Sequence, residues 1–275
     1  MKLEYIITKD EVNMRLDDFF YMKGISKKLV KDAKFKGSIT VNGVWEKVPY
    51  RTKENDHVVI VFSPEESHVV PVDIPINIIY EDEYLMVIDK QKDLASIPNR
   101  KYYTESLANG IMYYFKKNHI VSSVHMVNRL DKETSGLLLV AKSSYIHDVF
   151  SKDIKKVQRV YHALVEGDPG EGIVDASIGH DDDHATKRRI DGSGLSAITH
   201  YKTIKRMMDQ SIVECILETG RTHQIRVHMA YIRHPLVGDP LYGHEGTFYL
   251  DSVKISFEHP ITGKTLTFTK EDPYL

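Results

Sequence analysis

The sequence predicts an α+β protein, in which a small α+β module precedes a domain built on a mixed, largely antiparallel sheet with flanking helices. Two observations support this fold class. Strand-like runs outnumber helical stretches in the second part of the chain. A weakly periodic stretch with three prolines, at 63–75, has the composition of a linker. We therefore expect a first domain at 1–70, with its core at 12–62, and a second at 76–275.

The composition is that of a folded protein, since 41% of the 275 residues are hydrophobic and 28% are charged. A single cysteine, Cys215, excludes an intramolecular disulfide and a thiolate metal cage, and it favours a reducing compartment. The longest apolar runs, at 57–62 and 136–141, are far shorter than the roughly 20 residues of a membrane-spanning helix. The first 12 residues lack the apolar core of a signal peptide. We expect a soluble, cytoplasmic protein with no membrane partner.

The first part of the chain is basic, although the whole chain has a net charge of −2. Nine lysines and arginines lie between Lys23 and Lys53 against two acidic residues, which gives +7 there and leaves −9 for the remainder. A short helix is expected between Ser26, as N-cap, and Gly37, as the C′ residue that ends it. One face of this helix carries three ammonium groups, those of Lys27, Lys31 and Lys34 at i, i+4 and i+7, and Lys28 lies nearby.

Strands and a turn complete the first module. Asn42-Gly43 is a strong signal for a two-residue hairpin turn, and the segments 44–48 and 58–62 have the composition of return strands.

The second part contains strand-like segments separated by loops and a few helices. Six segments have the apolar runs or alternation of strands, namely 84–89, 136–142, 159–166, 197–204, 211–218 and 266–268. Three segments have helical spacing, namely 105–117, 145–154 and 222–233. In the last of these, Thr222 is the expected N-cap and Pro235 the stop signal.

The segment 129–136, RLDKETSG, is the first candidate for chemistry. It lies at the junction between a polar segment and an apolar strand, where a fixed backbone can present a reactive group to a ligand. Its Asp131 is the candidate acid. On spacing alone, an ordinary surface-turn carboxylate remains the favoured interpretation.

The segment 219–243 is the second candidate, because it gathers polar and basic residues at the start of an expected helix. Free backbone N–H groups at such an end stabilise anions. Arg226, one turn into the helix, is able to hold a carboxylate from another element through two parallel hydrogen bonds. A solvated helix face with ordinary surface charges is the alternative.

Metal and nucleotide cofactors find little support. The segment 180–184, HDDDH, has ligand-type residues, but an acidic run without periodicity is usually a solvated loop. His223 and His228 are five residues apart, which does not match the i, i+4 spacing of zinc-binding helices. The glycines form no dinucleotide-binding or P-loop pattern. We expect no metal and no cofactor.

Tyr161 is a further candidate, because a phenol can transfer a proton and its ring can stack on a base. A half-buried strand tyrosine is the alternative interpretation.

Taken together, these segments closely resemble the RluA-type family of RNA pseudouridine synthases. The family's three motifs correspond to NRLDKETSGLLLVAK, RVYHALVEG and TGRTHQIRVHMAYIRHPLVGDPLYG. Supporting segments are YEDEYLMVIDK and AITHY, so the resemblance extends over residues 74–273. The basic module is similar to the small αL-type RNA-binding domain, named for a ribosomal protein, that many members carry. Asn128 stands where most members have histidine, and Gln91 stands where they have proline.

The resemblance implies a role for each matching residue. Asp131 would be the catalytic aspartate, Tyr161 would stack on the target base and handle a proton, and Arg226 would pair with Asp131 and keep it ionised. Arg129 would fill the space left by a flipped-out nucleotide or contact the backbone. An apolar pocket for uracil would include Leu130, Ile225 and Leu217. The other residues expected to bind RNA are Arg221, Thr222, Lys187, Arg188 and the four helix lysines.

The sequence thus predicts a monomeric isomerase that converts uridine to pseudouridine in RNA, with ribosomal RNA as the expected substrate and transfer RNA as the alternative. A catalytically silent RNA-binding or ribosome-assembly protein of the same fold is the competing hypothesis, but it has no chemical need for Asp131, Tyr161 and Arg226. A glycosidase-like hydrolase is disfavoured, because no second carboxylate has a comparable setting.

Overall fold

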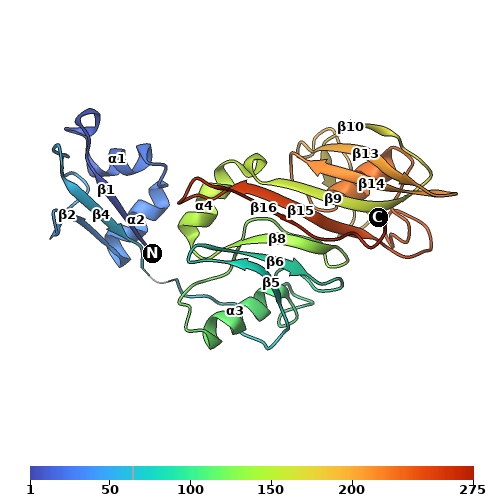
Figure 1. The fold of residues 1–275 in the computed structure, drawn as a ribbon, viewed down its shortest axis with the longest axis horizontal. Helices are drawn as coiled ribbons and strands as arrows, with labels where there is room; N and C mark the ends of the chain where they lie inside the picture. The colour runs from blue at the N-terminus through green and yellow to red at the C-terminus, as the bar shows by residue number, and fades with distance from the viewer. Residues whose placement is uncertain (64) are drawn as a thin grey trace.

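The computed structural model of the chain describes residues 1–63 and 65–275. Position 64, in the linker expected at 63–75, lies outside the described residues. Figure 1 shows a small body formed by the N-terminal residues beside a larger, elongated body that contains the rest of the chain.

The small body is a four-stranded antiparallel sheet with strand order β1-β4-β2-β3. Its strands are β1 (Lys2–Ile6), β2 (Ser38–Val41), β3 (Val44–Trp45) and β4 (His57–Val61), and its helical segments are η1 (Lys9–Glu11), α1 (Leu16–Met22) and α2 (Lys27–Lys36). The expected return strand at 44–48 is therefore only two residues long. Apolar side chains of both α-helices, among them Phe19 and Ala33, are fully buried against the sheet.

The sequence predicts the N-cap of α2 correctly, but not the backbone conformation at its C-terminal end. The Ser26 hydroxyl accepts from the Leu29 N–H at 3.5 Å, as expected of an N-cap. Gly37 follows the helix, but its φ of −108° is not left-handed, so the expected C′ geometry is wrong. Glycine is needed there because a Cβ would collide with the Val61 backbone. Asn42 and Gly43 have φ of 52° and 80°, which is the hairpin turn expected.

The segment that joins the two bodies is attached to the larger one. Phe62 stacks on Tyr145 with ring centroids 5.7 Å apart. Glu65 accepts from the Ser144 N–H at 2.7 Å and contacts His125 Nε2 at 2.6 Å. The Asn109 side chain donates to the Val70 carbonyl at 2.8 Å. These contacts fix the path of the chain between the sheets.

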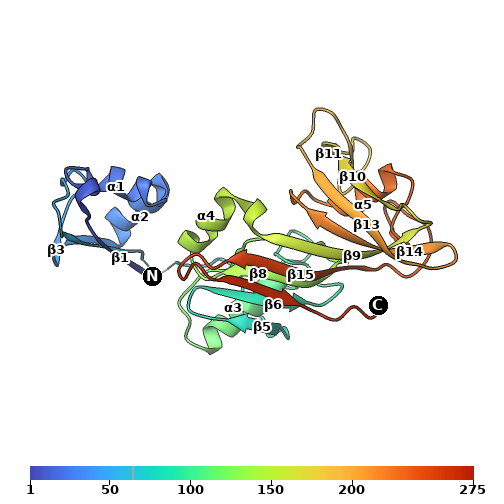
Figure 2. The same ribbon diagram turned by 45° about the horizontal axis from the view of Figure 1, so that its top comes forward.

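The larger body is built on a mixed ten-stranded sheet with the order β10-β13-β14-β9-β15-β8-β6-β5, with β16 paired to β15 and β7 to β8 (Figure 2). All pairings in it are antiparallel except that between β8 and β15. The first strands are β5 (Asn77–Glu81), β6 (Leu85–Lys90), β7 (His125–Met126), β8 (Ser135–Ala141) and β9 (Gln158–Glu166). They are followed by β10 (Glu171–Asp175), β13 (Ile198–Arg206), β14 (Gln210–Leu217), β15 (Leu250–Glu258) and β16 (Thr265–Thr269).

Helices and a short hairpin flank this sheet. They are α3 (Leu107–Lys117), α4 (Ser144–Lys152), η2 (Ile154–Lys156), α5 (Gln224–Tyr231) and the pair β11 (Ile178–His180) and β12 (Arg188–Ile190). One core cluster includes Leu138, Tyr161, Cys215 and Ile225, so strands β8, β9 and β14 share it with α5. This cluster lies beside the site described below.

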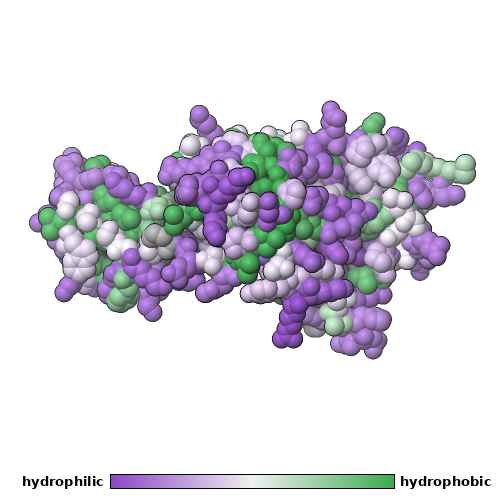
Figure 3. All heavy atoms as spheres, turned by 90° about the horizontal axis from the view of Figure 1, so that it is seen from below, coloured by the Kyte–Doolittle hydropathy of each residue, from purple (hydrophilic) through white to green (hydrophobic). Residues whose placement is uncertain are grey.

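No helix among the described residues is long and apolar enough to cross a bilayer. Seen from below, the molecule is mostly hydrophilic, with hydrophobic residues gathered in a band on the larger body (Figure 3).

The contact between β8 and β15 depends on Gly136, at the start of the apolar run. This residue has φ of +105° and lies against Asp251 and the Ser252 backbone, where a Cβ would overlap both. Its absent side chain allows β15 to approach β8 in parallel register, with Asp251 opposite Ser135.

We therefore predict that Gly136→Ala destabilises the protein by roughly 3 kcal/mol or more, because the new Cβ meets backbone atoms that cannot yield and the left-handed φ adds strain. Gly170→Ala is the matched control, since Gly170 also has a positive φ of 71° but open space around it. It should cost only about 1 kcal/mol. Urea unfolding of both variants measures the difference, and equal losses would contradict the packing argument.

Candidate active site

A cavity of about 430 Å³ opens where β7, β8, β9 and the β14–α5 turn meet. Its lining contains nine residues singled out from the sequence: Arg129, Leu130, Asp131, Tyr161, Leu217, Arg221, Thr222, Ile225 and Arg226. The lining does not include Lys187, Arg188 or the four α2 lysines expected to bind RNA. Segments that are 30 to 95 residues apart in the chain thus contribute to one site.

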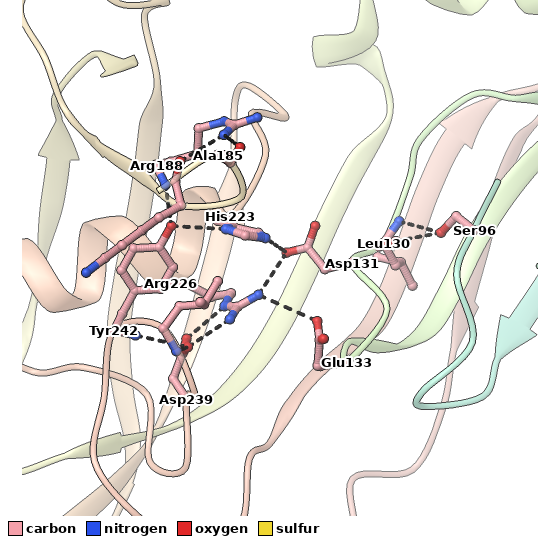
Figure 4. Close-up of polar contacts among 12 residues, drawn as sticks. Ser96, Leu130, Asp131, Glu133, Ala185, Arg188, His223, Arg226, Asp239 and Tyr242 are labelled. Atoms are coloured by element: carbon pink, nitrogen blue, oxygen red, sulfur yellow. Dashed lines mark hydrogen bonds and ion pairs between the residues drawn. The ribbon is translucent and has the colours of Figure 1, made fainter. Parts of the chain in front are cut away.

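Asp131 lies in the loop between β7 and β8, and neighbouring residues hold that loop in place. The Ser96 hydroxyl donates to the Leu130 carbonyl at 2.6 Å and accepts from the Leu130 N–H at 3.1 Å (Figure 4). The buried Lys90 ammonium donates to the carbonyls of Gln91, Leu94 and Lys132. The Asp131 carboxylate is thereby directed at the cavity with its side chain 26% exposed.

Arg226 of α5 is fully buried and faces three carboxylates. Its Nε and Nη2 donate to both oxygens of Asp239 at 2.7 and 2.8 Å. Its Nη1 lies 3.8 Å from Asp131 Oδ2 and 3.6 Å from Glu133 Oε2 (Figure 4). The expected ion pair with Asp131 is therefore present but loose, and the two parallel hydrogen bonds are made to Asp239. The sequence analysis missed Asp239, although it belongs to the same motif segment.

The pKa of Asp131 is affected more by burial than by Arg226, which was expected to keep the carboxyl ionised. Burial raises the pKa of the Asp131 carboxyl to about 6, Arg226 opposes this shift, and Glu133 adds to it. At neutral pH the group is still mainly ionised. Its pKa lies close to neutrality, which suits a carboxylate that must both act as a base or nucleophile and release its bond or proton.

The start of α5 corrects a second expectation, because the N-cap is His223 with φ of 58° and not Thr222. The Gln224 side chain accepts from the Arg221 N–H at 3.0 Å and donates to the Ile198 carbonyl at 3.0 Å. These two bonds hold the turn before α5, where Thr222 was expected to be the N-cap, against β13.

His223 connects the helix start to Asp131. The Tyr242 hydroxyl accepts from the Arg188 N–H at 2.7 Å and lies 3.0 Å from His223 Nδ1. The other ring nitrogen, Nε2, lies 4.0 Å from Asp131 Oδ2. Burial and the nearby Arg226 charge lower the pKa of His223 to about 4, so the ring is neutral. Arg188 thus contacts the site through Tyr242, and Lys187 Nζ lies 5.4 Å over the Tyr242 ring.

Tyr161 of β9 is 5% exposed and lines the cavity beside Leu217 and Ile225. Burial raises the pKa of its hydroxyl, while Ser252 and Asn128 beside it act in the opposite direction. Asn128 is fixed by the Leu139 N–H, which donates to its side-chain oxygen at 2.9 Å. The hydroxyl is therefore protonated at neutral pH, with a flat ring available to a ligand.

The acidic run at 180–184 has a structural explanation. Asp181 accepts from the backbone N–H groups of Asp183 and His184, at 3.0 and 3.1 Å, in a tight turn. Within the described ranges, no group of three or more His, Cys, Asp or Glu residues is placed to hold a metal ion.

A carboxylate beside a buried guanidinium, in a cavity of about 430 Å³ that an aromatic ring also lines, is suited to proton transfer or nucleophilic attack on a small planar substrate. Comparison with known proteins specifies the class. Residues 84–231 match the family model for RNA pseudouridylate synthases. The chain therefore belongs to the RNA pseudouridylate synthase family, whose members are isomerases that act on RNA.

Individual relatives agree with this assignment. An uncharacterized RNA pseudouridine synthase of Bacillus subtilis (strain 168), YjbO, is 41% identical and covers 89% of this chain and 90% of its own. Ribosomal large subunit pseudouridine synthase D of Zymomonas mobilis is 38% identical over 76% of this chain and 73% of its own. The structure of human RNA pseudouridylate synthase domain containing 1 superposes with a TM-score of 0.59 at 23% identity, covering 73% of this chain and 85% of its own. The predicted family, fold class and enzyme class are confirmed.

We predict that Asp131→Asn is more stable than the wild type above pH 6, by roughly 1–3 kcal/mol, because it removes a buried charge. The folded carboxyl takes up its proton near pH 6 and the unfolded one near 4. The wild type therefore gains stability relative to the variant as the pH falls from 7 to 4, and the difference shrinks. Urea unfolding at pH 8, 6 and 4 tests this, and a variant less stable than the wild type at pH 8 would contradict it.

Proposed function

We propose that this protein isomerises specific uridines of ribosomal RNA to pseudouridine, with Asp131 as the catalytic residue. The observation that carries the proposal is the Asp131 carboxylate, positioned 3.8 Å from Arg226 Nη1 in a cavity lined by Tyr161. Transfer RNA is the alternative substrate. The name of the Zymomonas relative, a ribosomal large subunit synthase, supports ribosomal RNA as the first choice.

The reaction needs little beyond these groups, because it gains and loses no atoms. The bond between uracil N1 and ribose C1′ breaks, the base rotates in place, and C5 bonds to C1′ as its proton leaves. Asp131 either attacks C1′ or assists removal of a ribose proton, and both roles require the ionised carboxylate that Arg226 favours.

The cavity provides for a base removed from its stack. A nucleotide inside an RNA helix must flip out before C1′ is accessible. Tyr161 would stack on the flipped base, and Leu130, Ile225 and Leu217 would enclose it while it is detached. The exposed Arg129 would occupy the vacated space or contact the backbone, and Arg221, Thr222, Lys187 and Arg188 would contact the RNA around the opening.

The small N-terminal body supplies a second RNA surface in this proposal, with residues 1–70 as an RNA-binding domain and 76–275 as the catalytic domain. The four expected RNA-binding lysines of α2, Lys27, Lys28, Lys31 and Lys34, are exposed. Lys34 Nζ lies 5.0 Å over the Phe35 ring, which is 68% exposed. Ammonium groups beside exposed aromatic rings suit phosphates and unstacked bases. We further propose that the protein acts as a monomer in the cytoplasm, where RNA substrates and a reducing environment coexist.

The chemical proposal predicts that the wild type releases tritium from carbon-5-labelled uridine in RNA and that Asp131→Asn does not. RNA affinity of the variant should change by less than about threefold, because the carboxylate reacts with the sugar and adds little to ground-state binding. Ribosomal and transfer RNA lacking the modification serve as separate substrates, in excess chelator. An RNA affinity that falls as far as the activity would contradict the role of Asp131. No release by the wild type from either RNA would contradict the function itself.

The RNA-binding proposal predicts that charge reversal at Lys27, Lys31 and Lys34 weakens RNA binding and reduces the slope of log K against log salt by about two to three. Reversal of the exposed Lys116, Lys117 and Lys264 of the larger body is the matched control and should leave the slope nearly unchanged. Filter binding from 50 to 300 mM salt measures both. An unaltered slope in the first variant would remove α2 from the RNA surface.

A further inference from the structure

Arg159 lies in the cavity wall with a positive charge that has no counter-ion. It is 2% exposed and lies two residues before Tyr161 on β9, so the two side chains extend from the same face of the strand. Within residues 1–63 and 65–275, no carboxylate pairs with its guanidinium. A buried charge without a partner costs free energy, and in a binding site it marks the place of a ligand with negative charge.

Two backbone contacts hold the guanidinium in one orientation. Its Nε donates to the Val157 carbonyl at 3.0 Å and its Nη2 to the Leu217 carbonyl at 3.2 Å. These bonds leave Nη1 without a hydrogen-bond partner among the described residues. Gly220 leaves room beside this nitrogen, since a Cβ there would approach Nη1 to 3.1 Å. The donor is therefore fixed in position and still free.

The other buried cations near the reacting groups have carboxylates near them. Arg226 is bound to both oxygens of Asp239 and also faces Asp131 and Glu133. Lys90 donates to three backbone carbonyls; burial lowers its pKa to about 8, and the charges of Asp131 and Glu133 oppose this shift. The Arg159 charge remains, and it acts on Tyr161: burial raises the pKa of that hydroxyl, and Arg159 is the strongest influence against the rise.

The proposed reaction creates negative charge on the base. Whether Asp131 attacks C1′ or assists proton removal from the ribose, the electron pair of the C1′–N1 bond moves to the base. Uracil is then an anion whose charge is shared between N1 and its carbonyl oxygens. When C5 bonds to C1′, C5 loses its proton and N1 takes one up, so the atoms and electrons balance.

We propose that Arg159 is a catalytic residue that stabilises the detached uracil anion by donating a charged hydrogen bond from Nη1 to the base. This inference rests on the proposed function, because it places the base on Tyr161. A preorganised donor aimed at developing charge acts mainly on the transition state, and removing one such donor typically slows the chemical step by 10²–10³-fold.

The test compares single-turnover rates of tritium release at saturating RNA for Arg159→Lys and Arg159→Gln. The lysine keeps the charge, whereas the glutamine keeps one donor group for a backbone carbonyl and loses the charge. We expect roughly a 100-fold slower step for Arg159→Gln, less than about a 10-fold loss for Arg159→Lys, and unchanged RNA affinity for both. Lys155→Gln is the matched control, since this nearby lysine is 59% exposed and pairs with Glu218, and its rate should equal that of the wild type.

Equal rates for Arg159→Lys and Arg159→Gln, whether high or low, would overturn the inference, because a purely structural clamp does not depend on charge in this way. A normal rate at saturation with weaker RNA binding and a smaller salt slope would also overturn it, since Arg159 would then contact a phosphate. If Arg159→Gln does not fold by circular dichroism, Arg159→Met takes its place and removes the buried charge with an apolar chain. A wild type without activity would contradict the proposed function, not this inference.

Discussion

The site depends on how the buried guanidinium of Arg226 is compensated. A fully buried cation costs free energy unless it has strong partners, and Asp239 supplies them to Arg226 through two parallel hydrogen bonds of 2.7 and 2.8 Å. Asp239 neutralises Arg226, so the third nitrogen is shared loosely between Asp131 and Glu133. Asp131 is thus held without being strongly paired. This is the physical reason that burial outweighs the ion pair and raises the pKa of Asp131 to about 6.

The sheet makes this arrangement possible, because it joins two sets of antiparallel strands through one parallel contact. β15 lies between β9, which carries Tyr161, and β8, which follows the Asp131 loop. Gly136 at that contact brings the two strands close enough for both side chains to face one cavity. A wider separation there would move the ring away from the carboxylate. Gly136 therefore sets the spacing between β8 and β15, a role that the neighbouring sequence does not indicate.

Local chemistry determined which features the sequence could predict. The Ser26 cap and the Asn42-Gly43 turn depend on adjacent residues, and both are present. The cavity residues were recognised as a set through the family motifs, whereas spacing alone favoured a surface turn for Asp131. Strand β15 was missed because its partners, β8 and β9, lie far away in the chain, and Asp239 was missed because its pairing with Arg226 depends on the fold of the loop after α5. The start of α5 lies one residue later than expected because the Gln224 side chain, in the first turn of the helix, accepts from the Arg221 N–H, which a search for Ser, Thr, Asp or Asn caps does not detect.

The charged side chains in the cavity match the charges that the proposed reaction develops on the sugar and on the base. In the proposed mechanism, attack at the sugar needs a carboxylate that is ionised but not strongly stabilised. Arg226 would keep Asp131 in this state, because Asp239 compensates most of the Arg226 charge. Beside Tyr161, where the proposed mechanism places the base, Arg159 has no carboxylate partner among the described residues. In the proposed mechanism, Arg226 and Arg159 thus have different functions, because Arg226 has a counter-ion and Arg159 meets a negative charge only while the base is detached. The unfavourable free energy of burying Arg159 without a partner would be offset when that anion forms, which would lower the barrier and not merely the energy of the bound substrate.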